Sequence, residues 1–163
     1  MDTIAIRQAG ADDAERLNTA LRHLSRAIGD EHGADPDMLR EAGFGSNPAF
    51  RALLAEADRE VIGAALYSPV FSTVRAGAGV YVSDLWVSEA ARGQGLGRKL
   101  LQAVAGGAAK VWNARFLKLV VYDDNPDARA FYDRLGFSAS QGETILTLDE
   151  TGLAALKNDR GTR

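Results

Sequence analysis

A glycine-rich turn between residues 92 and 97 constrains the fold of this chain more than any other feature. It has the sequence Arg92-Gly93-Gln94-Gly95-Leu96-Gly97 and follows an apolar, strand-like segment at 80–87. After it, apolar residues recur at helical spacing from 96 to 111, and a second apolar run follows at 116–122. Two strands joined through a helix need a crossover connection, so we expect them to lie parallel in one sheet.

The remainder of the chain predicts a mixed sheet. Further strands are expected at 3–7, 50–55, 61–67 and 144–148, with 50–55 and 61–67 forming an antiparallel hairpin. Further helices are expected through 17–28, after Asp35-Pro36, after Asn125-Pro126 and at 150–157, and a loop at 68–79. The predicted order β-α-α-β-β-β-α-β-α-β is an α+β fold, and 163 residues suit a single domain, 1–163.

Composition excludes several classes of function. Nineteen basic and 22 acidic residues give a net charge of −3, which gives no electrostatic case for binding nucleic acid. The absence of cysteine excludes disulfides, thiolate metal sites and a cysteine nucleophile, and two histidines supply a metal site poorly. No apolar run is long enough for a membrane span and the N-terminus lacks signal-peptide features, so we expect a cytoplasmic protein.

The glycine turn has the chemistry of an anion site. Alternating glycines allow backbone N–H groups to point inward, and the N-terminus of the following helix adds positive potential for a phosphate or pyrophosphate. Arg92 and Arg98 can add charge. Arg98 stands where the dinucleotide fingerprint needs its third glycine, and the P-loop spacing is absent. A turn that merely permits a tight strand-to-helix passage is the alternative.

Two motifs together resemble the GNAT superfamily of acyl-CoA-dependent N-acyltransferases. Arg92-x-x-Gly95-x-Gly97 resembles its pyrophosphate loop, and Asn125 to Phe137 resembles its N-x-x-A-x-x-F-Y-x-x-x-G-F helix. The two motifs occur in the right order with a strand between them, and the resemblance covers nearly the whole chain. Segments 63–73 and 80–87 also resemble the diamine (spermidine/spermine-type) acetyltransferase branch, except that Ser83 replaces the glutamate expected before Asp84.

This resemblance implies acetyl-CoA as co-substrate, no metal, a small-molecule amine as acceptor and a homodimer. It implies that the strand backbone at 85–87 pairs with the pantetheine arm while the amides of 93–98 hold the pyrophosphate. Asn125 caps its helix, which alone explains it, or also bonds the pantetheine. The expected cofactor-binding residues are Leu85, Trp86, Val87, Arg92, Gly93, Gln94, Gly95, Leu96, Gly97, Arg98 and Asn125.

Transfer of an acyl group from a thioester to an amine needs a neutral amine and a protonated leaving thiolate. Tyr132 is predicted to protonate the thiolate, because a neutral phenol is a proton donor at pH 7; the alternative is a half-buried tyrosine with local partners. Asp84 is predicted to deprotonate the amine, directly or through water. A carboxylate held by loop amides or the dimer partner, or a solvent relay without a base, are the alternatives. On an ideal strand Asp84 shares a face with Val82 and Trp86, and a bulge would change that.

The acceptor side is expected near the first two helices. Ser83, Tyr67 and Glu31 are candidate substrate residues, although Tyr67 could equally belong to the core. Acidic residues around 30–37 could attract a cationic amine or form a solvated face. His23 and His32 are interpreted as surface residues rather than bases.

The sequence therefore predicts an acetyl-CoA-dependent N-acetyltransferase that acts on a primary amine of a small diamine, polyamine-like or amino-acid-like molecule by direct attack. A protein or aminoglycoside N-acetyltransferase, a non-catalytic acyl-CoA sensor and a nucleotide-binding protein are the alternatives.

Overall fold

The computed structural model describes residues 3–159, which divide into two compact units with the break after Arg129. The first unit holds a five-stranded sheet and three helices. Its elements are β1 (Ala5–Gln8), η1 (Ala11–Asp13), α1 (Ala14–Ile28), α2 (Pro36–Phe44), β2 (Arg51–Ala57), β3 (Glu60–Ser72), β4 (Gly77–Val87), η2 (Glu89–Ala91), α3 (Leu96–Trp112) and β5 (Leu117–Leu119). Helix α4 (Pro126–Arg134) crosses the break, and the second unit also contains α5 (Glu150–Asn158).

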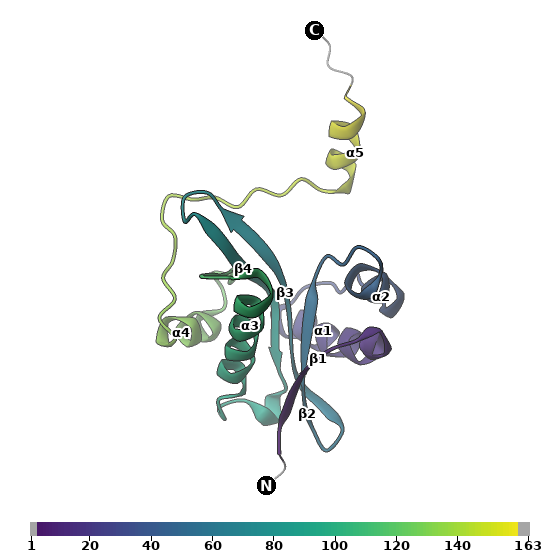
Figure 1. Ribbon diagram of the computed structural model, residues 1–163, viewed down its shortest axis with the longest axis vertical. Coiled ribbons are helices and arrows are strands. Elements are labelled where there is room, and N and C mark those ends of the chain that lie inside the picture. Colours follow the sequence, from purple (N-terminus) through teal and green to yellow (C-terminus); the bar gives the residue numbers. More distant parts are fainter. Residues whose placement is uncertain (1–2, 160–163) are drawn as a thin grey trace. The chain divides into compact units, whose positions relative to one another are not determined.

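The sheet is mixed, as predicted, with strand order β1-β2-β3-β4-β5. The first four strands are antiparallel neighbours, and β5 runs parallel to β4 after the α3 crossover. Figure 1 shows α1 and α2 on one side of this sheet and α3 on the other. The hairpin predicted between 50 and 67 is present, and its turn places Asp58 and Arg59 at positive φ, as a tight primed turn requires.

The helices form for the reasons that their sequences indicate. Leu17 and Leu21 of α1 are buried against Leu54 and Trp86 of the sheet, and α1 ends at Gly29 in the left-handed conformation. The Asp35 carboxylate caps α2 by accepting the Met38 N–H at 2.9 Å. On the opposite face, α3 buries its apolar stripe, Leu96, Leu100, Leu101 and Val104. Each such leucine contributes about 1.5–3 kcal/mol through burial.

The predicted loop at 68–79 is wrong, because β3 and β4 continue through most of it and meet at a turn over 73–76. Pro69 is tolerated because pairing with β2 ends at Tyr67, which leaves β3 with one open edge there. Gly79 does not mark a turn; a Cβ at this position would lie 2.4 Å from the Phe116 ring. The glycine instead allows the segment before β5 to approach β4 closely.

The C-terminal strands also differ from the sequence prediction. The apolar run 116–122 forms only a three-residue strand, and Val120 and Tyr122 beyond it are about half exposed rather than buried. Residues 144–148 are not a strand in the described chain, because they join no hydrogen-bonded ladder. The helix predicted at 150–157 is present as α5.

Candidate active site

The second half of β4 has a free edge. Strand β5 pairs with β4 only at Val80–Val82, whereas β3 pairs with β4 through to Val87. The Ser88 N–H donates to Ile62 of β3, and strand alternation directs the backbone of Trp86 the same way. The backbone groups of Leu85 and Val87 therefore point to the open side, where an extended ligand can pair with them like an added strand.

A bulge determines which side chains lie on each face of β4. Leu66 pairs with Asp84 but Tyr67 pairs with Val82, so Ser83 is an extra residue. Leu66 and Trp86 belong to the cluster under α1, which places Asp84 on the α1 face. The ideal-strand expectation that Val82 shares this face is wrong.

The glycine turn forms the link between this edge and α3. Gly93 and Gly95 have φ of +74° and +79°, and a Cβ added at either would meet no atom within 4 Å. Left-handed backbone is costly for other residues, which explains glycine here. The first amides of α3, at 96–98, have no partner within the helix and no side-chain cap, and they follow directly on the two glycines. The turn therefore has the geometry of an anion site at a helix N-terminus.

The polar side chains of the turn fix its shape. Arg92 Nε donates to the Val87 carbonyl at 3.2 Å, and Gln94 Nε2 donates to the Ala90 carbonyl at 3.1 Å. The first contact ties the turn to the end of β4, and the second ties it to η2. The guanidinium group of Arg92 and the side chain of Arg98 are exposed, where they add positive charge next to the free amides.

The Asp84 carboxylate is largely enclosed. Burial raises the pKa of this carboxyl group, while its neighbours Ser83 and His32 act in the opposite direction. Ser83 itself is exposed at the bulge, and its hydroxyl donates to the Leu66 carbonyl at 3.4 Å. A carboxylate that is harder to ionise than usual is also a stronger base, which suits proton removal from an amine.

The remaining predicted acceptor residues, Glu31 and Tyr67, lie in different environments. Glu31 is exposed on the connection between α1 and α2, beside His32. Tyr67 is only 3 % exposed and packs on Trp112 of α3 with ring centroids 6.0 Å apart, so it lies on the opposite face from Asp84. Tyr67 therefore belongs to the core and not to the acceptor side.

The two histidines have different environments. His23 is exposed, as expected, but stacks on Trp86 with ring centroids 5.4 Å apart. His32 is half-buried and both its ring nitrogens are hydrogen-bonded, so its interpretation as a surface residue is wrong. The available signal was a polar stripe on α1, Asn18, Arg22 and Ser25, at helical spacings of four and three.

Asn125 and Tyr132 lie on the α4 segment. The Asn125 side chain accepts the Ala128 N–H at 3.2 Å, so it caps the helix as predicted. Within the second unit, the Tyr132 ring makes edge contacts with the rings of Phe131 and Phe137, with centroids 5.1 and 5.4 Å apart. Burial raises the pKa of the Tyr132 phenol, which keeps it protonated and able to donate.

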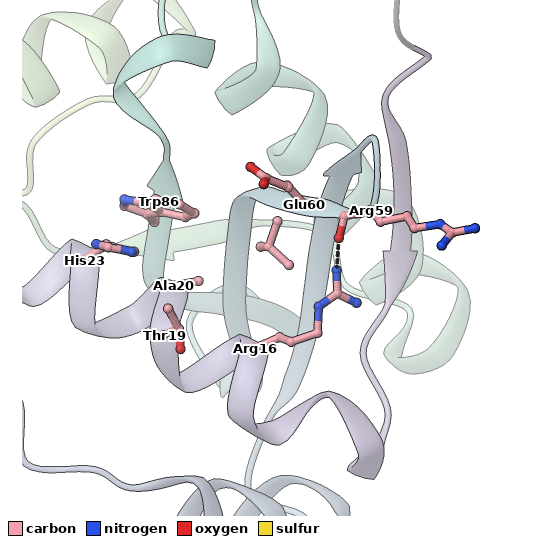
Figure 2. Close-up of a pocket in the computed structure, with 8 residues that line it drawn as sticks. Arg16, Thr19, Ala20, His23, Arg59, Glu60 and Trp86 are labelled. Carbon is pink, nitrogen blue, oxygen red and sulfur yellow. Dashed lines mark hydrogen bonds between the residues drawn. The ribbon is translucent and has the colours of Figure 1, made fainter.

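A shallow pocket of about 300 Å³ lies on the α1 face beside Trp86. Figure 2 shows His23 and Trp86 side by side at one end of it, and Arg16 donating to the Arg59 carbonyl, at 2.9 Å, at the other. The lining residues are Arg16, Thr19, Ala20, His23, Arg59, Glu60, Val61 and Trp86. Within residues 3–159, no cluster of potential ligands is arranged for a metal ion, and no helix is long and apolar enough to cross a bilayer.

Comparison with known families decides the assignment. The model of the Acetyltransferase (GNAT) family matches residues 18–137, which include the free edge of β4, the glycine turn and the Asn125–Phe137 helix. The chain belongs to the GNAT acetyltransferase family. As a GNAT enzyme it is an acetyl-CoA-dependent N-acetyltransferase.

Two characterised relatives carry names that specify amine acceptors. A thialysine N-epsilon-acetyltransferase of Sus scrofa is 33 % identical over 146 residues, covering 83 % of this chain and 85 % of that protein. The L-ornithine N5-acetyltransferase NATA1 of Arabidopsis thaliana is 35 % identical over 99 residues, covering 61 % of this chain and 43 % of that protein.

Solved structures show the same GNAT fold. An integron cassette protein from the mobile metagenome of V. cholerae superimposes with a TM-score of 0.79 at 23 % identity, covering 95 % of this chain and 98 % of that one. The aminoglycoside N-acetyltransferase AAC(6')-Iy, solved in complex with CoA, gives a TM-score of 0.72 at 19 % identity, covering 92 % and 97 %.

Proposed function

We propose that this GNAT enzyme acetylates a primary amine on a small diamine-like or amino-acid-like molecule. The observation that carries the proposal is the enclosed Asp84 carboxylate, which lies at the start of the free β4 edge with Asp30 and Glu31 on a neighbouring connection of the α1 side. Negative groups attract an aminoalkyl cation. The relatives named for thialysine and ornithine, both amino acids with a second amine, support the same class of acceptor.

The residues of this chain divide the work between binding and proton transfer. The amides of the glycine turn would bind the pyrophosphate of acetyl-CoA, and the backbone of Leu85 and Val87 would pair with the pantetheine arm. A backbone N–H of this edge would polarise the thioester carbonyl, a role that contributes about 3 kcal/mol in comparable sites. Bound acetyl-CoA supplies the acetyl group.

Two proton transfers complete the scheme. Asp84 takes a proton from the acceptor ammonium, directly or through water, so that the amine lone pair can form the new C–N bond. Tyr132 donates its phenolic proton as the C–S bond breaks, so that CoA leaves as a thiol. Ser83, which is exposed at the bulge next to Asp84, would hydrogen-bond the acceptor. No residue of the chain becomes acylated.

We further propose that the protein is a homodimer. In the described chain, the segment 144–148 carries exposed apolar side chains: Ile145 is 70 % exposed and Leu146 is 89 % exposed. Leu148 and, on α5, Leu153 and Leu156 are also exposed. An apolar surface of this kind needs a partner, and a second copy is the occupant that the family resemblance favours. Light scattering should give twice the chain mass, and Leu146→Asp should lower it; a monomer mass at micromolar concentration would contradict the dimer.

The function is tested by acetyl-CoA turnover against a panel of amines, with released CoA detected by a thiol-reactive dye. The protein has no cysteine and adds no background. Thialysine, ornithine, lysine, spermidine, putrescine, an aminoglycoside and a lysine peptide form the panel. We expect a small diamine or diamino acid to be turned over fastest. Preference for the aminoglycoside or peptide would shift the acceptor class, and tight acetyl-CoA binding without turnover would favour a sensor.

A further inference from the structure

A buried polar cluster links α1 to the connection that follows it. Asn18 is 1 % exposed, although its neighbours on α1 are core leucines. Burying an amide is costly unless its polar atoms are paired. In the orientation that satisfies both ends, Asn18 donates to His32 Nε2 at 2.8 Å and to the Ala34 carbonyl at 3.2 Å. Its oxygen accepts from the Arg22 guanidinium at 3.1 Å. The two acceptors, His32 and Ala34, lie on the connection between α1 and α2.

The second ring nitrogen of His32 completes the attachment. Ser25 donates its hydroxyl proton to the Leu21 carbonyl at 3.1 Å, so its oxygen is free to accept from His32 Nδ1, 3.0 Å away. The partners thus assign the proton to Nδ1 and leave Nε2 as an acceptor. With both nitrogens held by residues on α1, the imidazole ring has one orientation, and the backbone around residue 32 is fixed to the helix.

The residues just before His32 are also held by the chain that follows β5. Asp30, two residues before His32, accepts the Tyr122 hydroxyl at 2.8 Å, and Tyr122 follows β5. Asp84 faces α1, the helix to which His32 is attached. Residues 30–32 therefore link α1 to the chain after β5, on the face of the sheet toward which Asp84 points.

We propose that His32 is a positioning residue for the amine acceptor: its attachment to Asn18 and Ser25 fixes residues 30–32 so that Asp30 and Glu31 hold the acceptor's cationic groups beside Asp84. The proposal rests on the proposed function, since it concerns the acceptor side of that same site. Acetyl-CoA binding is not involved, because its expected groups at 85–87 and 92–98 belong to other elements. His32 acts through the segment and transfers no proton.

The test compares His32→Ala with His32→Gln and with the control Arg26→Ala, which removes an exposed side chain from the last turn of α1. With the amine that the wild type acetylates best, His32→Ala should raise the amine KM about tenfold. The acetyl-CoA KM should stay within twofold and the Tm should show that the variant is folded. Glutamine can both donate and accept at the two positions, so His32→Gln should recover part of the loss. Arg26→Ala should leave the amine KM within twofold.

A second measurement needs no substrate and separates this proposal from the proposed function. Hydrogen exchange of the unliganded protein should show amides in 29–35 exchanging at least tenfold faster in His32→Ala, with those in 85–98 unchanged. If the wild type acetylates no amine, the proposed function fails, and unchanged exchange in 29–35 would then also refute the anchor. Where turnover is found, an unchanged amine KM in folded His32→Ala, or equal increases in both KM values, would overturn the proposal.

Discussion

Asp13 offers a test of how the first helix is held against the sheet. Its carboxylate accepts two hydrogen bonds from the Arg7 guanidinium and one from the Gly10 N–H, each 2.8 Å long. Glu56 on β2 also binds Arg7, at 2.9 and 3.0 Å, and pairs with Arg16 at 2.6 Å. These four charged side chains join β1, η1, α1 and β2. The substitution Asp13→Asn keeps the size of the side chain but removes one charge from the network.

The expected loss of stability follows from the pKa of Asp13. The hydrogen bonds from Arg7 lower it from 3.8 to about 2. That difference corresponds to about 2.5 kcal/mol of preferential binding of the ionised form. The side chains of Arg7 and Arg16 are 40 % and 38 % exposed, so solvent screens part of this energy. We expect Asp13→Asn to lower the free energy of unfolding by about 1–2 kcal/mol and Tm by about 3–6 °C at pH 7.

The contribution of Asp13 to the free energy of unfolding should depend on pH in a defined direction. Because the folded-state pKa of Asp13 is lower than its unfolded value, the contribution is complete above about pH 4. It is lost as the pH falls from there toward 2. Urea unfolding of wild type and Asp13→Asn should therefore give curves that differ at pH 5–7 and converge in acid. Asp12→Asn, a neighbouring exposed carboxylate outside the described ion pairs, is the control. A loss below about 0.5 kcal/mol, or one that persists unchanged in acid, would refute the reasoning.

Three further predictions concern the candidate active site. Tyr132→Phe should lower kcat at least tenfold with little change in acetyl-CoA affinity, and unchanged turnover across pH would remove Tyr132 from the mechanism. In the wild type, kcat/KM should rise with pH as Asp84 ionises, at a pH above the usual aspartate range because its pKa is raised. Asp84→Asn should abolish this rise. The same variant should have a higher Tm at pH 7, since a folded-state pKa above the unfolded value means that the ionised carboxylate costs stability there; a lower Tm would contradict this. Gly95→Ala forces a side chain into φ +79°, at a cost of about 1–2 kcal/mol, and should weaken acetyl-CoA binding measured by calorimetry, whereas Gly106→Ala, inside α3 with open space around it, should not.

Local sequence patterns predicted the elements whose stability is local. The α1 leucine stripe, the Asp35 cap of α2 and the Asn125 cap of α4 all depend on residues within a few positions of one another, and all are present. The extent of the β3–β4 hairpin could not be predicted in this way. Its glycines look like turn residues, yet Gly79 is required by the ring of Phe116, 37 positions later in the chain.

The site shows the same division between local and distant contacts. The glycine turn is a local motif, because positive φ at Gly93 and Gly95 depends on those residues alone. The face on which Asp84 lies depends on one extra residue in β4, and a bulge is defined only by the partner strand. Alternation alone therefore predicts that Val82 and Asp84 share a face, and it does not assign Tyr67 to the core.

The bulge at Ser83 also has a chemical consequence. A regular strand that kept Val80 and Val82 facing α3 would turn Asp84 to that same apolar side, among the buried leucines. The additional residue reverses the alternation, so that Asp84 faces α1 and the segment anchored by His32, while Leu85 and Val87 present their backbone to the open edge. With Ser83 outside the pairing, the strand offers a carboxylate on one face and strand-like hydrogen-bonding groups at its edge. Deletion of Ser83 would remove the bulge without changing the pairing of Val82 with Tyr67 and of Asp84 with Leu66, so Asp84 should keep its face and acetyl-CoA binding should be retained.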